Sequence, residues 1–264
     1  SPGDQRDARR AGAVTERAAV PGRPKQGPTL PEGGSPYPVS RVLHDAALVD
    51  LDGTLVNTLG DFELALGRTL GDLGLPAVGR AFIERTVGQG SEHLIRSTLA
   101  EAGGAPSQYD DAWARYQVHY RAINGQASLV YPGVVEGLQR LRGLGLRLAC
   151  LTNKPLAFAQ DLLRTKGLTG YFDHCFGGDS FERKKPDPLP LRKACEALGS
   201  TPARTLMVGD SRNDVQAARA AGCPVVLVTY GYNHGEPIGG VPALAHVGRI
   251  DALAPSLPTK LARP

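Results

Sequence analysis

Residues 46–58, AALVDLDGTLVNT, are the stretch that decides the fold. A short apolar run that ends in acids and a Gly-Thr turn is typical of a buried parallel strand, and open α/β sheets bind ligands at the carboxyl ends of such strands. Because strand residues alternate between faces, we expect the carboxylates of Asp50 and Asp52 to project to the same side. With neither Cys nor His directly beside them, two such acids favour an oxygen-seeking cation such as Mg²⁺. The alternative for an isolated D-x-D-G-T is a pair of solvated turn residues.

Composition and charge limit the class of protein. The 264 residues suffice for one large domain or two modest ones, and no apolar run approaches the about 18 residues that a membrane span needs. A net charge of +4 is small for this length and argues against nucleic acid or acidic lipid as a partner. Four cysteines, far apart and without a CxxC pair, are typical of reduced thiols. The sequence predicts a cytoplasmic protein and leaves open a monomer or a homodimer.

The chain divides into three parts that differ in composition and hydrophobic periodicity. Residues 1–40 mix glycine, proline and charge without an apolar face and predict a disordered tail. Residues 58–130 carry helical periodicity without a strand signal, and a block of this length is too long for a crossover, so we predict a helical cap domain. Residues 41–57 and 131–264 alternate strands and helices. The predicted fold class is therefore α/β, a Rossmann-like parallel sheet with helices on both faces and an inserted all-helical cap.

The periodicity also places individual elements. Within the cap we expect helices from residue 61 onward and at 80–86, 91–102 and 109–123. After the cap we expect strands at 146–151, 172–176, 205–208 and 225–228. The helices expected before and between these strands span residues 133–144, 155–166, 188–198 and 214–221.

Polar residues follow three of the predicted strands, with a lysine between two of these groups: Asp50 and Asp52; Thr152 and Asn153; Lys185; and Asp210 and Asp214 in GDSRND. Because parallel strands end at one edge of a sheet, we expect these side chains to converge there. Carboxylates can hold a divalent cation, while hydroxyl and ammonium groups can donate to phosphate oxygens. Taken singly, each is more often a strand-exit turn, a solvated lysine or a first-turn helix acid.

The order of these segments resembles the four motifs of the haloacid dehalogenase superfamily of phosphohydrolases. DLDGT at residues 50–54 is similar to the first motif, Thr152 in LTN to the second, Lys185 before proline to the third, and GDSRND to the fourth. Within the superfamily, YPGVVEGLQRL, KPDPLP and TYGYNHGEPI are most similar to bacterial phosphoglycolate phosphatases. The resemblance spans residues 45–228. It implies a Mg²⁺-dependent phosphoric monoester hydrolase that converts 2-phosphoglycolate to glycolate and phosphate through an aspartyl-phosphate.

The resemblance also implies a role for each matching residue. Asp50 would be the nucleophile, and Asp52 would protonate the leaving alkoxide and then take a proton from water. The groups implied to bind phosphate or substrate are Gly53, Thr54, Thr152, Asn153 and Lys185. Lys184 is an alternative to Lys185, which we favour because it directly precedes the proline. Mg²⁺ would be held by an Asp50 oxygen, the Asp52 main-chain carbonyl and Asp210, with Asp214 orienting Lys185 or a metal-bound water.

Substrate choice is expected to reside in the cap. The segment TVGQG, residues 86–90, precedes a predicted helix, so backbone N–H groups at Gly88 and Gln89 could meet a substrate carboxylate. The alternative is that the glycines merely allow a turn. Further candidate anion partners are Arg85, His93 and Arg96. The loop at residues 230–236 is interpreted as a turn and packing element at the border of the site.

Other functions remain open at this point. The substrate could be another small phosphorylated metabolite, such as a sugar phosphate or pyrophosphate, and a sugar phosphomutase could use the same scaffold. A non-catalytic binding protein is disfavoured because both Asp50 and Asp52 are intact. A dehalogenase is disfavoured because Asp52, Thr54 and the phosphate-binding set match the phosphatase pattern.

Overall fold

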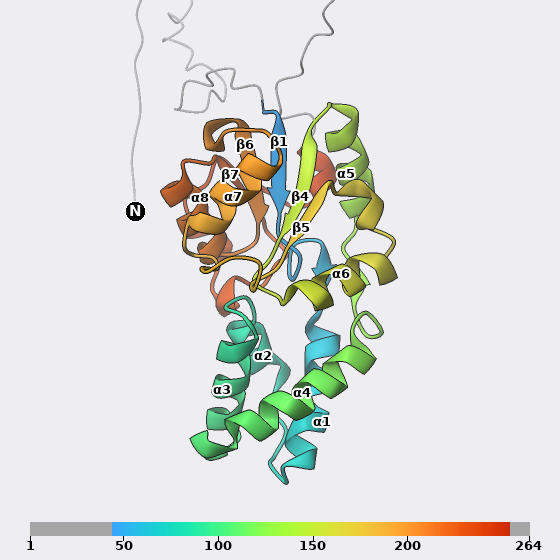
Figure 1. Cartoon of the computed structure of the whole chain (residues 1–264), viewed down its shortest axis with the longest axis vertical. Coiled ribbons are helices and arrows are strands. Elements are labelled where there is room, and N and C mark those ends of the chain that lie inside the picture. Colours follow the sequence, from blue (N-terminus) through green and yellow to red (C-terminus); the bar gives the residue numbers. More distant parts are fainter. Residues whose placement is uncertain (1–43, 254–264) are drawn as a thin grey trace, which may run out of the picture. The chain divides into compact units, whose positions relative to one another are not determined.

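The computed structural model describes residues 44–253, which contain a six-stranded parallel sheet in the order β5-β4-β1-β6-β7-β8 (Figure 1). β1 (Ala46–Val49) pairs along its whole length with β4 (Arg147–Leu151) on one side and β6 (Thr205–Gly209) on the other. The outer strands are β5 (His174–Phe176), β7 (Val225–Val228) and β8 (Ala245–Val247). All four β1 side chains are fully buried, as expected for a strand that is paired on both edges and covered on both faces.

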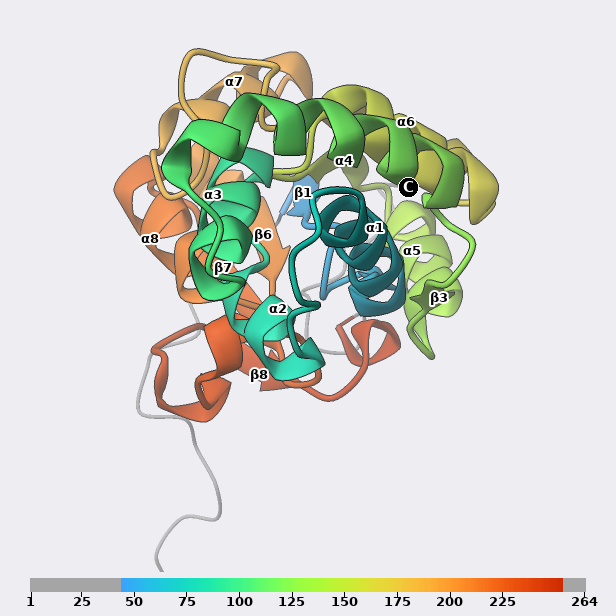
Figure 2. The ribbon, with the colours of Figure 1, turned by 90° about the horizontal axis from the view of Figure 1, so that it is seen from below.

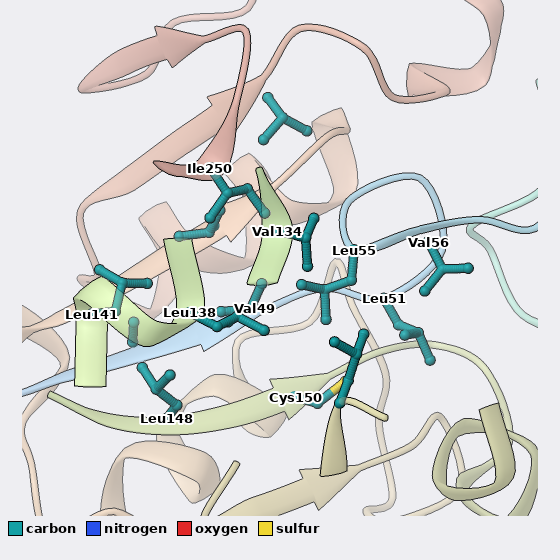
Figure 3. Close-up of a cluster of buried hydrophobic side chains, with 14 of the residues drawn as sticks. Val49, Leu51, Leu55, Val56, Val134, Leu138, Leu141, Leu148, Cys150 and Ile250 are labelled. Atoms are coloured by element: carbon teal, nitrogen blue, oxygen red, sulfur yellow. The ribbon is translucent and has the colours of Figure 1, made fainter. Parts of the chain in front are cut away.

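Helices cover both faces of this sheet, which confirms the predicted α/β class. α5 (Val134–Gly143) and α6 (Leu156–Thr165) lie on the face to which Ala47 and Val49 point. Figure 3 shows Val49 packed with side chains of α5 and β4 in that layer. α7 (Leu189–Ala197) and α8 (Arg212–Ala221) cover the opposite face, where Ala46 and Leu48 are buried. The alternation along AALV therefore divides the apolar core into two layers.

Along the chain, four helices follow β1 and precede the other strands of the six-stranded sheet, which confirms an inserted helical cap. They are α1 (Leu59–Asp72), α2 (Arg80–Thr86), α3 (Ser91–Glu101) and α4 (Tyr109–Ile123). These helices enclose a separate hydrophobic cluster that includes Tyr116 and Tyr120, and Phe158 and Tyr232 join it from outside the cap. Figures 1 and 2 show the four helices beyond the carboxyl ends of the strands. The domain boundaries at residues 57/58 and 130/131 stay a prediction.

Several short elements complete the described chain. β2 (Val56–Asn57) and β3 (Leu129–Val130) form an antiparallel pair where the chain enters and leaves the cap. The 3₁₀ helices are η1 (Pro106–Gln108), η2 (Thr169–Tyr171), η3 (Pro202–Arg204), η4 (Asn233–Gly235), η5 (Ile238–Gly240) and η6 (Ile250–Ala252). None of the helices in residues 44–253 has the length and apolar character to span a bilayer. The predicted tail, residues 1–40, lies outside the described residues.

A buried carboxylate fastens the two ends of the cap to each other. Asp61, in the first turn of α1, is fully buried. Its Oδ2 accepts a 2.8 Å hydrogen bond from the Gly125 N–H, and its Oδ1 accepts a 2.7 Å hydrogen bond from the Ala127 N–H. These two N–H groups belong to the segment that runs from α4 to β3. Asp61 therefore holds the chain that leaves the cap beside the helix that begins it.

We predict that Asp61→Ala lowers the free energy of unfolding by about 1–3 kcal/mol, because the Gly125 and Ala127 N–H groups lose their acceptors. Urea unfolding followed by circular dichroism measures the change. Glu63→Ala is the matched control on the same helix, since Glu63 is 48% exposed in its ion pair with Arg80 and should cost at most about 1 kcal/mol. Equal losses in the two variants would contradict a structural role for Asp61.

Candidate active site

Asp50 lies directly after β1, at the end of the central strand. Its N–H donates to the Val208 carbonyl at 2.9 Å, so the sheet pairing fixes the backbone at this residue. Its carboxylate Oδ1 lies 3.0 Å from the Lys185 Nζ and accepts a 2.8 Å hydrogen bond from the Leu51 N–H. Burial raises the pKa of Asp50 to about 7, although the Lys185 ammonium opposes the shift. A further positive partner beside Lys185 would favour the ionised form of this carboxylate.

Lys185 is the buried cation that joins the ends of three elements. Its Nζ donates to the Asp214 Oδ1 at 2.8 Å and to the carbonyl of Leu151, the last residue of β4, at 2.9 Å. Burial alone would lower the pKa of Lys185, but the Asp214 and Asp50 carboxylates outweigh it and raise the pKa above its ordinary value. Lys184, the alternative left open by the sequence, lies instead beside Gly90 of the cap. The lysine next to Asp50 is thus the one that precedes the proline.

Three buried carboxylates form a candidate metal centre. Oxygen atoms of Asp50, Asp210 and Asp214 all lie within 4.8 Å of one another. Burial raises the pKa of Asp210 well above its ordinary value, and the Asp214 and Asp50 charges add to this shift. One lysine cannot balance three acids, and a donor set made only of oxygen suits Mg²⁺. The residues present therefore fit a divalent cation at this end of the sheet.

Two loops hold the Asp210 carboxylate in place. Thr54 Oγ1 donates to the Asp210 Oδ1 at 3.1 Å, and the Tyr232 N–H donates to its Oδ2 at 2.7 Å. Gly53 and Gly231 pack directly against the same carboxylate, since a Cβ on either glycine would collide with the Asp210 side chain. The loop at 230–236, interpreted from the sequence as a turn and packing element at the border of the site, therefore packs against a candidate metal ligand. Gly53 and Thr54, predicted to bind substrate, lie against Asp210.

Asp214 serves both the helix that carries it and the charge cluster. Its Oδ2 accepts hydrogen bonds from the Asp210 N–H at 3.1 Å and from the Ser211 N–H at 3.1 Å, as expected near the start of a helix. Its other oxygen binds Lys185. Asp214 therefore makes the contacts expected of a first-turn helix acid and also contacts Lys185.

A pocket lies between the strand ends and the cap. The strand-end segments contribute Asp50, Asp52, Thr152, Asn153 and Lys154 to its lining. The cap and α6 contribute mostly apolar side chains and backbone: Phe62, Val87, Gly88, Gly90, Ser91, Leu94, Tyr116, Tyr120 and Phe158. Asn153 connects the two sides, because its Nδ2 donates to the Gly88 carbonyl at 2.9 Å and to the Lys185 carbonyl at 2.8 Å. A ligand here would contact the sheet and the cap together.

Only some of the remaining candidate residues from the sequence line this pocket. Thr152 and Gly88 line it, whereas Gln89 does not. The three candidate anion partners in the cap also lie outside its lining: Arg85, His93 and Arg96. Arg96 instead pairs with Glu92 at 2.9 Å and lies over the Tyr109 ring. The cap loop thus supplies backbone and small residues to the pocket, without the charged side chains suggested by the sequence.

Lys154 also lines the pocket, although the sequence predicted no site role for it. Its Nζ lies 2.9 Å from the Asp52 Oδ1, with the rings of Phe62 and Tyr120 at 4.5 and 4.7 Å. We expected Asp50 and Asp52 to face one side, and both line the pocket, but each carboxylate has its own lysine. The available signal was the position of Lys154 directly after Thr152-Asn153. A lysine after a strand is ordinarily solvated, which is why the sequence alone gave it no weight.

Comparison with known proteins identifies the family. A family model of haloacid dehalogenase-like hydrolases matches residues 44–222. The chain belongs to this family. Phosphoglycolate phosphatase of Thiobacillus denitrificans is 43% identical over 215 residues, which cover 80% of this chain and 92% of that protein. The plasmid-encoded phosphoglycolate phosphatase of Cupriavidus necator is 46% identical over 209 residues, which cover 79% of this chain and 89% of that protein.

A solved structure has the same fold as this haloacid dehalogenase-like hydrolase. The crystal structure of a predicted phosphoglycolate phosphatase from Haemophilus somnus 129pt superposes with a TM-score of 0.78 at 32% sequence identity. The match covers 81% of this chain and 97% of that one. The sheet, the cap and the pocket between them all fall within residues 44–253. The family assignment therefore confirms the superfamily that the four motifs indicated.

The close packing of Gly231 against Asp210 gives a test of the metal centre. We predict that Gly231→Ala displaces the Asp210 carboxylate and raises the Mg²⁺ concentration for half-maximal hydrolysis of p-nitrophenyl phosphate by about 10- to 100-fold. Gly239→Ala is the matched control in the same segment, because a Cβ there would meet no atom within 4 Å. An unchanged Mg²⁺ requirement in a folded Gly231→Ala variant would argue against Asp210 as a ligand.

Proposed function

We propose that this haloacid dehalogenase-like hydrolase is a Mg²⁺-dependent phosphatase of 2-phosphoglycolate, with Asp50 as its nucleophile. The observation that carries the proposal is the buried cluster in which Asp50 lies 3.0 Å from Lys185 and within reach of Asp210 and Asp214. Two relatives at 43% and 46% identity that are named phosphoglycolate phosphatase support the substrate. Phosphatases of this family generally use Mg²⁺, and the acidic cluster fits that ion.

The first half of the reaction would transfer the phosphoryl group to Asp50. An Asp50 oxygen attacks phosphorus, the bond from phosphorus to the glycolate oxygen breaks, and an aspartyl-phosphate forms. Lys185 and the Thr152 hydroxyl would bind the equatorial oxygens and stabilise their charge in the transition state. When bound by Asp50, Asp210, Asp214 and the Asp52 carbonyl, Mg²⁺ supplies the charge that lets a carboxylate and a phosphate dianion approach each other.

Asp52 would supply the proton that the leaving group needs. An alkyl alkoxide leaves poorly without protonation, and the Asp52 carboxyl lines the same pocket as Asp50. Once glycolate has left, water can occupy the same place, and Asp52 would then remove its proton as it attacks the aspartyl-phosphate. One residue can therefore serve both steps, because the leaving oxygen and the attacking water occupy one position in turn.

We also propose that the enzyme acts in the cytoplasm as a monomer or homodimer, with no nucleic-acid or membrane partner. The four cysteines support a reducing compartment, since Cys150, Cys175, Cys195 and Cys223 are all free thiols. Two of them lie within β4 and β5, where they pack as small apolar residues.

A substrate panel tests the proposed function. We expect kcat/KM to be highest for 2-phosphoglycolate when it is compared with a sugar monophosphate and with pyrophosphate. EDTA should abolish turnover and added Mg²⁺ should restore it, while Asp50→Asn serves as the folded, inactive control. If 2-phosphoglycolate were the slowest of the three, the substrate assignment would fail. Interconversion of phosphosugars without release of phosphate would indicate a mutase instead.

The acid role of Asp52 predicts a dependence on the leaving group. Asp52→Asn should lower kcat/KM for 2-phosphoglycolate by about 10²- to 10⁴-fold, and that for p-nitrophenyl phosphate by less than about tenfold, because an aryl oxide leaves without a proton. Asp161→Asn is the control, since the Asp161 side chain lies on α6, is 51% exposed and forms an ion pair with Arg164. Equal losses on the two esters would exclude Asp52 as the proton donor.

A further inference from the structure

Lys154 places a positive charge inside the pocket. Its side chain is only 3% exposed, although lysine is rarely buried without a reason. Among the pocket-lining residues in the described part of the chain, Lys154 is the one that carries a positive charge. It lies two residues after Thr152, so the end of β4 delivers a phosphate-binding candidate and this lysine to the same pocket.

The surroundings of Lys154 leave it able to bind a further anion. Its Nζ lies 2.9 and 3.2 Å from the two oxygens of Asp52, which is the one carboxylate that the described residues place against it. On another side it meets the faces of Phe62 and Tyr120, an arrangement that favours a desolvated cation without using its N–H groups fully. An ammonium carries three N–H donors, so a second anionic acceptor can be accommodated.

We propose that Lys154 binds the carboxylate of the substrate and so selects a phosphorylated carboxylic acid over phosphate esters that lack the acid group. The inference rests on the proposed function, because it specifies how that active site recognises 2-phosphoglycolate. The phosphate would be bound at Asp50, Thr152 and Lys185. The carboxylate would otherwise be buried among apolar and aromatic side chains without a partner, which is costly.

The covalent structure of 2-phosphoglycolate places its carboxylate at the right distance. The carboxylate carbon is separated from the leaving oxygen by a single methylene group. Asp52 must lie beside that oxygen if it donates the proton, and Lys154 is in direct contact with Asp52. A substrate held for reaction with Asp52 therefore brings its carboxylate into the neighbourhood of Lys154.

Other cations near the pocket are less suited to this role. Arg85 and Arg96 lie outside the pocket lining, and Arg96 is committed to Glu92. Lys184 approaches Gly90 from outside the lining. Backbone N–H groups of the cap loop can add hydrogen bonds to the carboxylate, but they supply no full charge. Lys184 is therefore the matched control for a nearby lysine.

The test compares 2-phosphoglycolate with ethyl phosphate, which has the same carbon chain and no carboxylate. The quantity measured is the ratio of the two kcat/KM values, which cancels losses common to both esters, including partial misfolding and a misplaced Asp52. We expect Lys154→Met and Lys154→Gln to lower this ratio by about 10- to 100-fold, the loss of one charge-assisted contact. Lys184→Met should leave the ratio within about twofold of that of the unmodified protein. If turnover is too slow, calorimetric binding of the two esters supplies the same ratio.

Three outcomes would count against this inference, and one of them would also count against the proposed function. If the unmodified protein prefers 2-phosphoglycolate but the Lys154 variants keep that preference, Lys154 only positions Asp52 and the inference alone is overturned. If the unmodified protein shows no preference for 2-phosphoglycolate over ethyl phosphate, the proposed substrate fails and the inference fails with it. A ratio that falls in Lys184→Met and not in Lys154→Met would assign the carboxylate to Lys184.

Discussion

The contact between Lys185 and the Asp50–Asp214 pair is the interaction on which the rest of the site depends. Three acids are gathered within 4.8 Å at the end of a sheet, where burial makes their negative charge expensive. Lys185 is held there by the Leu151 carbonyl and by Asp214, so its ammonium lies against Asp50 without being free to leave for solvent. The sheet, the helix that carries Asp214 and the loop that carries Lys185 therefore have to fold together before Asp50 acquires its surroundings.

The two halves of the pocket have different physical characters. The strand ends provide fixed charges and hydrogen-bond donors, each held by a neighbour, as Asp210 is held by Thr54 and Tyr232. The cap provides aromatic faces and a glycine-containing loop, and the Asn153 amide links that loop to the sheet. In the function proposed above, bond cleavage would take place at the strand ends. Substrate selection would take place at the boundary, where Lys154 contacts Asp52 on one side and Phe62 and Tyr120 on the other.

Much of the fold could be predicted because its elements follow strong periodicities. The helices at 80–86 and 109–123 agree with α2 and α4 residue for residue, and the fully buried AALV run is the central strand. The short strands β2, β3 and β8 escaped prediction, because two or three residues carry no measurable alternation. In the site, the motif order indicated Asp50, Thr152, Lys185, Asp210 and Asp214. Lys154 could not be predicted from local sequence. Its partner Asp52 lies 102 residues away in the chain, and the aromatic rings that bury it belong to the cap.

The antiparallel β2–β3 pair has a consequence for how the molecule can vary. The chain departs at Asn57 and returns at Leu129, which are direct partners, so both connections of the cap meet at a two-residue ladder. Beside this ladder, Asp61 binds the first turn of α1 to the segment between α4 and β3. Because both connections of the cap meet at this one place, residues can be inserted between Asn57 and Leu129 without interrupting the parallel sheet that carries the buried charges.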